Sequence, residues 1–169
     1  MKNTIAKMMG GSISTILVVS TLAFGIALAQ EGARNAGSQG GGGRLEGTWD
    51  TQVTIRNCAT GAALGTFPSI GSFIQGGTSI GSTAGRPQSS RTPEHGVWSH
   101  QSGNIYNFKF KSFNFDAAGN STGWTIVQHQ VLLDHSGDTY TSAGTGENYD
   151  ANGNLLITLC SSATATRFQ

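Results

Sequence analysis

Residues 116–154 read DAAGN-STGWTIVQHQVLL-DHSGD-TYTSAGTGENY-DANGN, so the pattern Asp-x-x-Gly-(Asn/Asp) occurs at 116–120, 134–138 and 150–154. In such a segment the Asp carboxylate caps a type I turn, and the Gly takes the left-handed conformation that leads into a returning strand. Each interval between these turns holds one strand of about 11 to 13 residues. The stretch therefore predicts long antiparallel strands joined by tight turns.

The chain has the same character from Leu45 onward. Segments rich in Thr, Val, Ile, Phe and Tyr, which favour strands, are separated by Gly and Asn, which favour turns. No window shows apolar residues at helical spacing. The expected strands are 46–58, 68–75, 78–83, 95–101, 104–115, 120–134, 138–149 and 154–168, with an irregular connection at 84–94. We predict an all-β domain over 45–169, an eight-stranded antiparallel up-and-down meander closed into a barrel. Closure removes exposed strand edges and leaves an interior wide enough for one small ligand.

Two residue pairs predict the register that closes the barrel. The numbers of Trp49 and Arg167 add to nearly the same total as those of Cys58 and Cys160, as expected for one antiparallel ladder between the first and last strands. The odd spacing within each strand puts the two pairs on opposite faces. We predict a disulfide between Cys58 and Cys160, worth about 4 to 5 kcal/mol for so long a loop. Two buried free thiols are the alternative.

The first strand opens with Gly47-Thr48-Trp49, and Arg167 stands near the end of the last strand. This arrangement resembles the signature of the calycin superfamily, which includes lipocalins, fatty-acid-binding proteins and avidins. In lipocalins the Trp caps the closed end of the barrel and the Arg stacks over it, which implies a structural, barrel-closing role for Trp49 and Arg167. The middle lipocalin motifs and a C-terminal helix are missing, and the chain is closer in size to avidins.

Residues 123–126 also resemble an avidin strand, but the polar set that contacts biotin cannot be mapped, so biotin is not implied. The whole mature chain is similar to short exported bacterial calycin-like proteins of unassigned function.

The N-terminus has the features of a secretory signal peptide over residues 1–29. Lys2 and Lys7 form a positive region, a short apolar run follows, and cleavage is expected near Ala29. The run is shorter than a spanning helix needs, although an uncleaved anchor is the alternative. Residues 30–44 are Gly-rich and are expected to form a flexible leader. These features predict a secreted or periplasmic protein with no membrane span in the mature chain.

The composition and motifs argue against several function classes. The net charge of +1 gives no footprint for nucleic acid. The histidines, which are His95, His100, His129 and His135, lack metal-ligand spacing, so no metal and no cofactor are expected. No nucleophile motif is present, and the turn acids Asp116, Asp134, Asp138 and Asp150 are interpreted as caps, so catalytic residues stay unknown.

Alternating aromatics are the strongest indication of a binding site. Tyr106, Phe108 and Phe110 share one face of a strand, whereas Phe113 and Phe115 have the opposite parity. We therefore expect a bulge near 111–112 that restores the pattern.

The favoured function is an exported barrel that binds a small apolar or aromatic molecule. Its expected lining residues are Trp98, Tyr106, Phe108, Trp124 and His129. One alternative is a cyclase or isomerase built in a barrel, resembling allene oxide cyclases or dirigent-like enzymes; enzymatic activity is uncertain and is the less favoured reading. The other is a structural or interaction domain whose aromatics simply fill a solid core. The sequence does not indicate the ligand or the oligomeric state.

Overall fold

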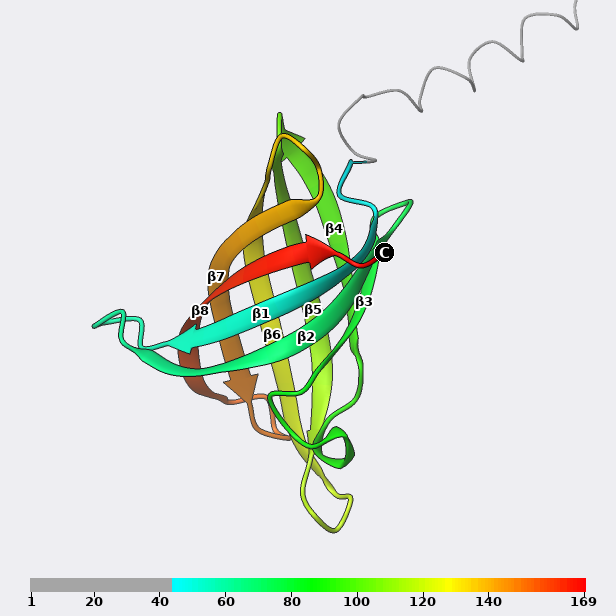
Figure 1. Cartoon of the computed structure of the whole chain (residues 1–169). Coiled ribbons are helices and arrows are strands. Elements are labelled where there is room, and N and C mark those ends of the chain that lie inside the picture. Colours follow the sequence, from blue (N-terminus) through cyan, green and yellow to red (C-terminus); the bar gives the residue numbers. More distant parts are fainter. Residues whose placement is uncertain (1–43) are drawn as a thin grey trace, which may run out of the picture. The chain divides into compact units, whose positions relative to one another are not determined.

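The computed structural model describes residues 44–169, and the predicted signal peptide at 1–29 and the leader up to residue 43 lie outside them. The strands are β1 (Gly47–Arg56), β2 (Ala63–Ile74), β3 (Thr78–Thr83), β4 (Glu94–Ser102), β5 (Ile105–Phe115), β6 (Ser121–Leu133), β7 (Thr139–Tyr149) and β8 (Leu155–Arg167). Each pairs antiparallel with the next, and β8 pairs with β1, which closes the barrel (Figure 1). The predicted all-β, eight-stranded up-and-down barrel is confirmed.

The three Asp turns form as the sequence predicts. The Asp116 carboxylate accepts hydrogen bonds from the backbone N–H groups of Ala118 and Asn120, and Asp150 repeats the pattern in its own turn. The turn glycines have positive φ, as in Gly119 at 84°, Gly137 at 82° and Gly153 at 88°. These local hydrogen bonds set the lengths of β6 and β7.

Strand β2 begins at Ala63, earlier than the predicted start at 68. The carbonyl of Pro68 accepts a hydrogen bond from the N–H of Ala84, which follows β3. The backbone polar groups of Pro68 therefore point toward β3 and not toward β1. The β2–β3 ladder ends at the next pair, Ser69 with Thr83, so the missing Pro N–H costs no ladder hydrogen bond. A strand can therefore run through this proline.

The first and last strands meet in the predicted register, with Trp49 opposite Arg167. Trp49 is fully buried, and the Arg167 guanidinium lies 4.3 Å from its ring centroid. Arg167 also donates hydrogen bonds to the carbonyls of Glu46 and Gly137, at 2.7 Å each. It thus ties the chain before β1 and the β6–β7 turn across one end of the barrel, which we call the closed end.

The Cys58–Cys160 disulfide is present, with its Cα atoms 4.9 Å apart. Cys160 faces outward, because its neighbours Leu159 and Ser161 line the interior. The bridge therefore lies on the opposite face of the β1–β8 ladder from Trp49, as predicted.

The expected bulge near 111–112 is wrong. The β5–β6 register runs without a break to Asn114 and shifts only between Asn114 and Phe115. Ser112 and Asn114 occupy the buried inward positions, where Ser112 accepts a hydrogen bond from Arg91 and Asn114 pairs with Thr125. Because Ser112 and Asn114 have hydrogen-bond partners inside the barrel, they can occupy these inward positions. The strand therefore needs no bulge to bring Phe113 or Phe115 inward in their place.

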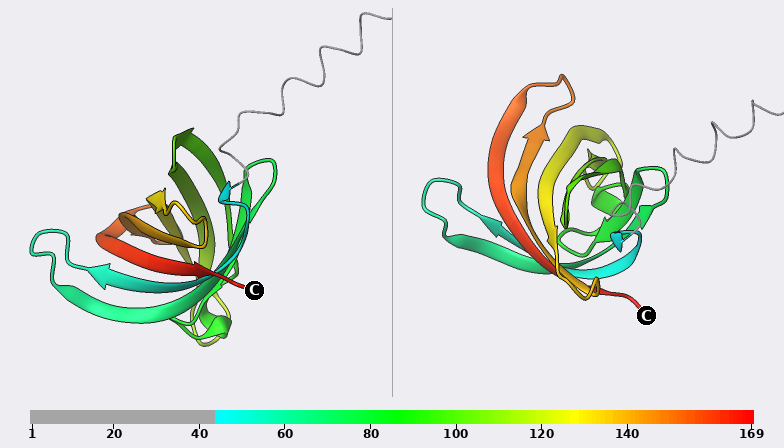
Figure 2. Two further views of the ribbon diagram at one scale, coloured as in Figure 1. Left: turned by 45° about the horizontal axis from the view of Figure 1, so that its top comes forward. Right: turned by 90° about the horizontal axis from the view of Figure 1, so that it is seen from above.

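The buried apolar core gathers at the closed end. Its residues are Leu45, Trp49, Phe73, Trp98, Tyr106, Val131, Leu133, Tyr140 and Ala165. Seen along the barrel, the strands form a ring, and the loop that joins β1 to β2 projects outward (Figure 2). The other end, where β1 ends and β4 begins, is called the open end below.

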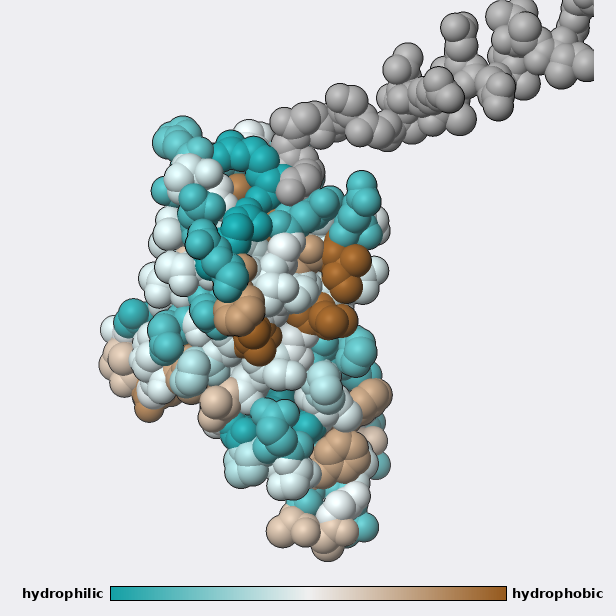
Figure 3. Space-filling model, turned by 45° about the vertical axis from the view of Figure 1, so that its right-hand side comes forward, coloured by the Kyte–Doolittle hydropathy of each residue, from teal (hydrophilic) through white to brown (hydrophobic). Residues whose placement is uncertain are grey.

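The outer surface is not uniformly polar. Exposed apolar side chains on β2, β3 and β4 are Leu64, Ile70, Ile74, Ile80 and Val97. Figure 3 shows strongly hydrophobic side chains gathered on the side of the barrel that carries β3. Inward and outward positions are therefore harder to tell apart here by hydropathy alone.

Candidate functional site

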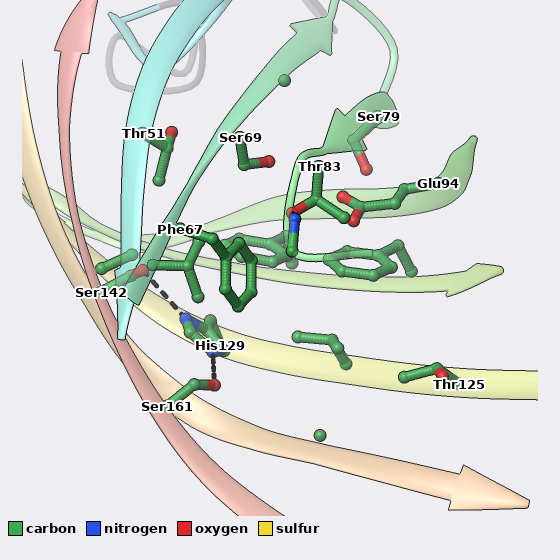
Figure 4. A pocket seen from close by; sticks show the side chains of 18 of the residues that line it. Thr51, Phe67, Ser69, Ser79, Thr83, Glu94, Thr125, His129, Ser142 and Ser161 are labelled. Atoms are coloured by element: carbon green, nitrogen blue, oxygen red, sulfur yellow. Dashed lines mark hydrogen bonds between the residues drawn. The ribbon is translucent and has the colours of Figure 1, made fainter. Parts of the chain in front are cut away.

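A cavity of about 280 Å³ lies inside the barrel, and all eight strands contribute to its lining. Its apolar lining includes Val53, Phe67, Phe108, Phe110, Val127 and Leu159. Its polar lining includes Thr51, Ser69, Ser79, Thr83, Glu94, Thr125, His129, Ser142 and Ser161, and Figure 4 shows these side chains around the cavity. The barrel interior is therefore not packed solid.

His129 is held on the cavity wall by two serines. Its Nδ1 lies 2.9 Å from the Ser142 hydroxyl, and its Nε2 lies 2.7 Å from the Ser161 hydroxyl (Figure 4). Burial lowers the pKa of His129 to about 4, so the ring is neutral near pH 7. A neutral imidazole has one donor and one acceptor nitrogen, so one serine donates to the ring and the other accepts from it.

The packing around His129 explains its position. Phe108 lies opposite it on β5, with the two rings 5.2 Å apart and nearly parallel at 29°. Gly144 lies opposite it on β7, where a Cβ atom would lie 2.6 Å from the His129 ring. Such a Cβ atom would also overlap the Gln128 carbonyl oxygen, so the absence of a side chain at 144 lets β7 lie close to the β6 backbone and leaves space for the imidazole.

A charged pair lies at the open end of the cavity. Arg91, in the connection before β4, contacts the Glu94 carboxylate at 3.2 Å and donates a 2.7 Å hydrogen bond to the Ser112 hydroxyl. Both charged side chains are nearly buried, with exposed fractions of 11% for Arg91 and 12% for Glu94. Arg86 also lines the cavity and is exposed, so the cavity reaches the surface there.

Burial changes the acidity of these groups. It raises the pKa of Glu94, and the Arg91 charge opposes that change. Burial lowers the pKa of Arg91; Glu94 raises it and Arg86 lowers it. Tyr140 lines the same cavity, and burial raises the pKa of its phenol. Burial therefore shifts the pKa of three groups that line the same cavity, Glu94 on β4, His129 on β6 and Tyr140 on β7.

The five expected lining residues separate into three groups. Phe108 and His129 line the cavity. Trp98 and Tyr106 belong to the core at the closed end, and the Trp98 indole N–H donates to the carbonyl of Ile74 at 2.9 Å. The structure thus brings together two of the predicted residues at the cavity and two in the packed core beside it.

Trp124 does not line the cavity, and its expected position is corrected. Val127 and His129 point inward, so the even-numbered Trp124 points outward. Its ring stacks on Tyr149, with centroids 5.7 Å apart, and lies 4.2 Å from the Lys111 ammonium. Trp124 therefore packs on the outer surface of the barrel and not inside it.

Sequence reasoning missed several cavity residues. Glu94 has the same parity as Trp98, and that signal could have placed its carboxylate inside the barrel. Ser142 and Ser161 gave no comparable signal, because serine is mostly found on exposed faces and its presence does not indicate an inward position. Arg91 stands in the irregular connection, where no periodicity indicates a direction.

The remaining histidines lie apart from the cavity. His95 and the turn residue His135 are exposed, and the His100 ring contacts Tyr106 and lies 2.9 Å from the Gly103 carbonyl. Within residues 44–169, no three His, Cys, Asp or Glu side chains are grouped so that they could hold a metal ion. The same residues contain no helix with the length and apolar character of a membrane span.

Neither a protein-family model nor a curated protein nor a solved structure matches the chain. The closed antiparallel barrel is consistent with a calycin-like fold. The indication of function therefore comes from the residues that line the cavity and from their geometry.

Proposed function

We propose that this protein is an exported calycin-like barrel that binds one small apolar or aromatic molecule in its cavity. The observation that carries the proposal is the lining, in which aromatic and aliphatic side chains lie beside hydroxyl, imidazole and charged groups that can orient a ligand. The volume of about 280 Å³ is just below the range of roughly 300–1,000 Å³ that ligand pockets usually have, which favours a small molecule. The guanidinium of Arg167 over the Trp49 ring supports the calycin assignment.

Export is part of the same proposal. The disulfide between Cys58 and Cys160 is typical of proteins that fold in an oxidising compartment. The predicted signal peptide at 1–29 agrees with secretion or a periplasmic location. Peptide mapping of the secreted fraction should give a mature N-terminus just after Ala29, and a chain retained whole in the cytoplasm would contradict export.

A thermal-shift screen of small apolar and aromatic molecules tests the binding proposal. A ligand at a hundred times its dissociation constant should stabilise the fold by about 2.7 kcal/mol. Val127→Phe places a large ring in the cavity and should remove the shift, whereas Ile126→Phe, on the other face of β6, should keep it. Equal shifts in both variants would refute binding in the cavity.

A second candidate is an isomerase or cyclase that uses the same cavity. His129, Glu94 and Tyr140 line it together, and burial shifts the pKa of each. Such groups can move protons within a bound substrate, and general acid–base catalysis contributes about 10²–10⁴-fold in rate.

NMR of a stabilising ligand, incubated with the protein, separates the two candidates. An enzyme would convert it to an isomer of equal mass, and His129→Gln or Tyr140→Phe would lower the rate of that conversion by a larger factor than the affinity for the ligand. A ligand recovered unchanged would contradict the enzyme and would support a protein that only binds its ligand.

A further inference from the structure

The charges at the open end of the cavity do not balance. Arg91 and Arg86 both line the cavity, and each carries a positive charge. The charged groups that act on Arg91 are Glu94, which is attractive, and Arg86, which is repulsive. Two guanidinium groups thus face a single carboxylate, which leaves one positive charge without a partner in this part of the cavity.

The hydrogen bonding of Arg91 is also incomplete. One nitrogen, Nη2, makes the contacts to both Glu94 and Ser112. The Arg91 Nε is buried and has no hydrogen-bond partner, the one such side-chain atom found among residues 44–169. Leaving a buried donor unpaired costs roughly 1 to 3 kcal/mol, more for a charged group, so native proteins rarely do so without a reason.

An anionic ligand would correct the charge imbalance and offer acceptors to the guanidinium. The surplus is one unit of charge, which fits a carboxylate better than a phosphate monoester, which carries about −1.5 to −2. The planar guanidinium also matches the geometry of a carboxylate. The aromatic side chains of Phe67, Phe108 and Phe110 line the same cavity and can cover an apolar body.

We propose that the ligand is a small apolar carboxylic acid, bound as its carboxylate beside Arg91 and Arg86. This inference rests on the proposed binding function and specifies its ligand class. The acidic group lies at the open end, and the apolar body extends along the phenylalanines into the barrel.

Isothermal titration of the disulfide-intact protein with three probes of one shape tests the inference. The probes are 2-naphthoate, the neutral 2-naphthamide and 2-naphthalenesulfonate. The carboxylate should bind about tenfold or more tightly than the amide, as expected for hydrogen bonds to charged groups. A sulfonate that binds more tightly than the carboxylate would overturn the choice of carboxylate.

Variants locate the charge effect. Arg91→Ala should weaken naphthoate binding about tenfold or more and change naphthamide binding less than about twofold. Arg86→Ala should weaken naphthoate binding more than naphthamide binding. Because Arg86 lies in an exposed connection, this variant still gives a result if Arg91→Ala fails to fold. Lys109→Ala removes the same charge from an exposed site on another face and should change neither affinity.

The outcomes separate the inference from the function beneath it. Equal affinity for naphthoate and naphthamide, or equal losses for both in Arg91→Ala and Arg86→Ala, would refute the carboxylate site while leaving a binding cavity. No binding of any probe to the unchanged protein would refute both.

Discussion

Acidification should destabilise the protein through His129. The folded state holds this ring neutral, and burial lowers its pKa from 6.5 to about 4. The unfolded chain therefore binds the proton more readily than the folded chain between these two values. The stability that the neutral ring contributes is fully present above pH 6.5 and is lost as the pH falls toward 4.

The size of this effect follows from the two pKa values. Their difference corresponds to about 3 kcal/mol, of which about 2 kcal/mol is lost between pH 7 and pH 4.5. Because Glu94 has a raised pKa, its contribution has the opposite sign and partly offsets the loss. A comparison with His129→Gln, which cannot titrate and retains Glu94, isolates the histidine.

Urea unfolding at a series of pH values measures the effect. The unchanged protein should lose about 2 kcal/mol more than His129→Gln between pH 7 and pH 4.5. His135→Gln is the matched control, since His135 is exposed in the β6–β7 turn, and its curve should follow that of the unchanged protein. Parallel curves for the unchanged protein and His129→Gln would refute the buried, neutral imidazole.

Three further predictions concern the frame of the barrel. Reducing the Cys58–Cys160 disulfide should lower the free energy of unfolding by about 4 to 5 kcal/mol, measured by urea unfolding with and without reductant. Arg167→Lys should cost about 1 to 3 kcal/mol, because an ammonium cannot replace the guanidinium hydrogen bonds across the closed end; an unchanged melting temperature would contradict this role. Gly144→Ala should cost about 1 to 3 kcal/mol by overpacking against β6, whereas Gly146→Ala, which has room for a methyl group, should melt close to the unchanged protein.

The fold was predictable because local chemistry fixes it. The Asp and Gly residues of the three turns satisfy their own backbone, so their positions determine where β6 and β7 begin and end. The first-to-last register was predictable from two residue pairs, because antiparallel partners keep a constant sum of residue numbers. The early start of β2 was not, because Pro68 indicates a break unless the length of the neighbouring strand is known.

The site was predictable only in part. Phe108 and His129 share the inward parity of their strands, but Trp124 was assigned to the wrong face because β6 carries apolar residues on both faces. Trp98 and Tyr106 point inward as expected. Whether an inward side chain joins the core or lines the cavity depends on its position along the barrel axis, which hydropathy does not indicate. Arg91 stands outside any regular strand, so only the folded chain shows its contact with Glu94.

Intermolecular NMR contacts with bound 2-naphthoate test the central claim most directly. If the barrel holds its ligand inside, naphthyl protons should give nuclear Overhauser effects to the methyl groups of Val53 and Val127, which line the cavity. The exposed methyl groups of Ile70 and Val97 on the outer face, which do not line the cavity, should give none. Contacts to the outer face alone, or saturable binding without contacts to Val53 and Val127, would contradict a cavity-binding barrel.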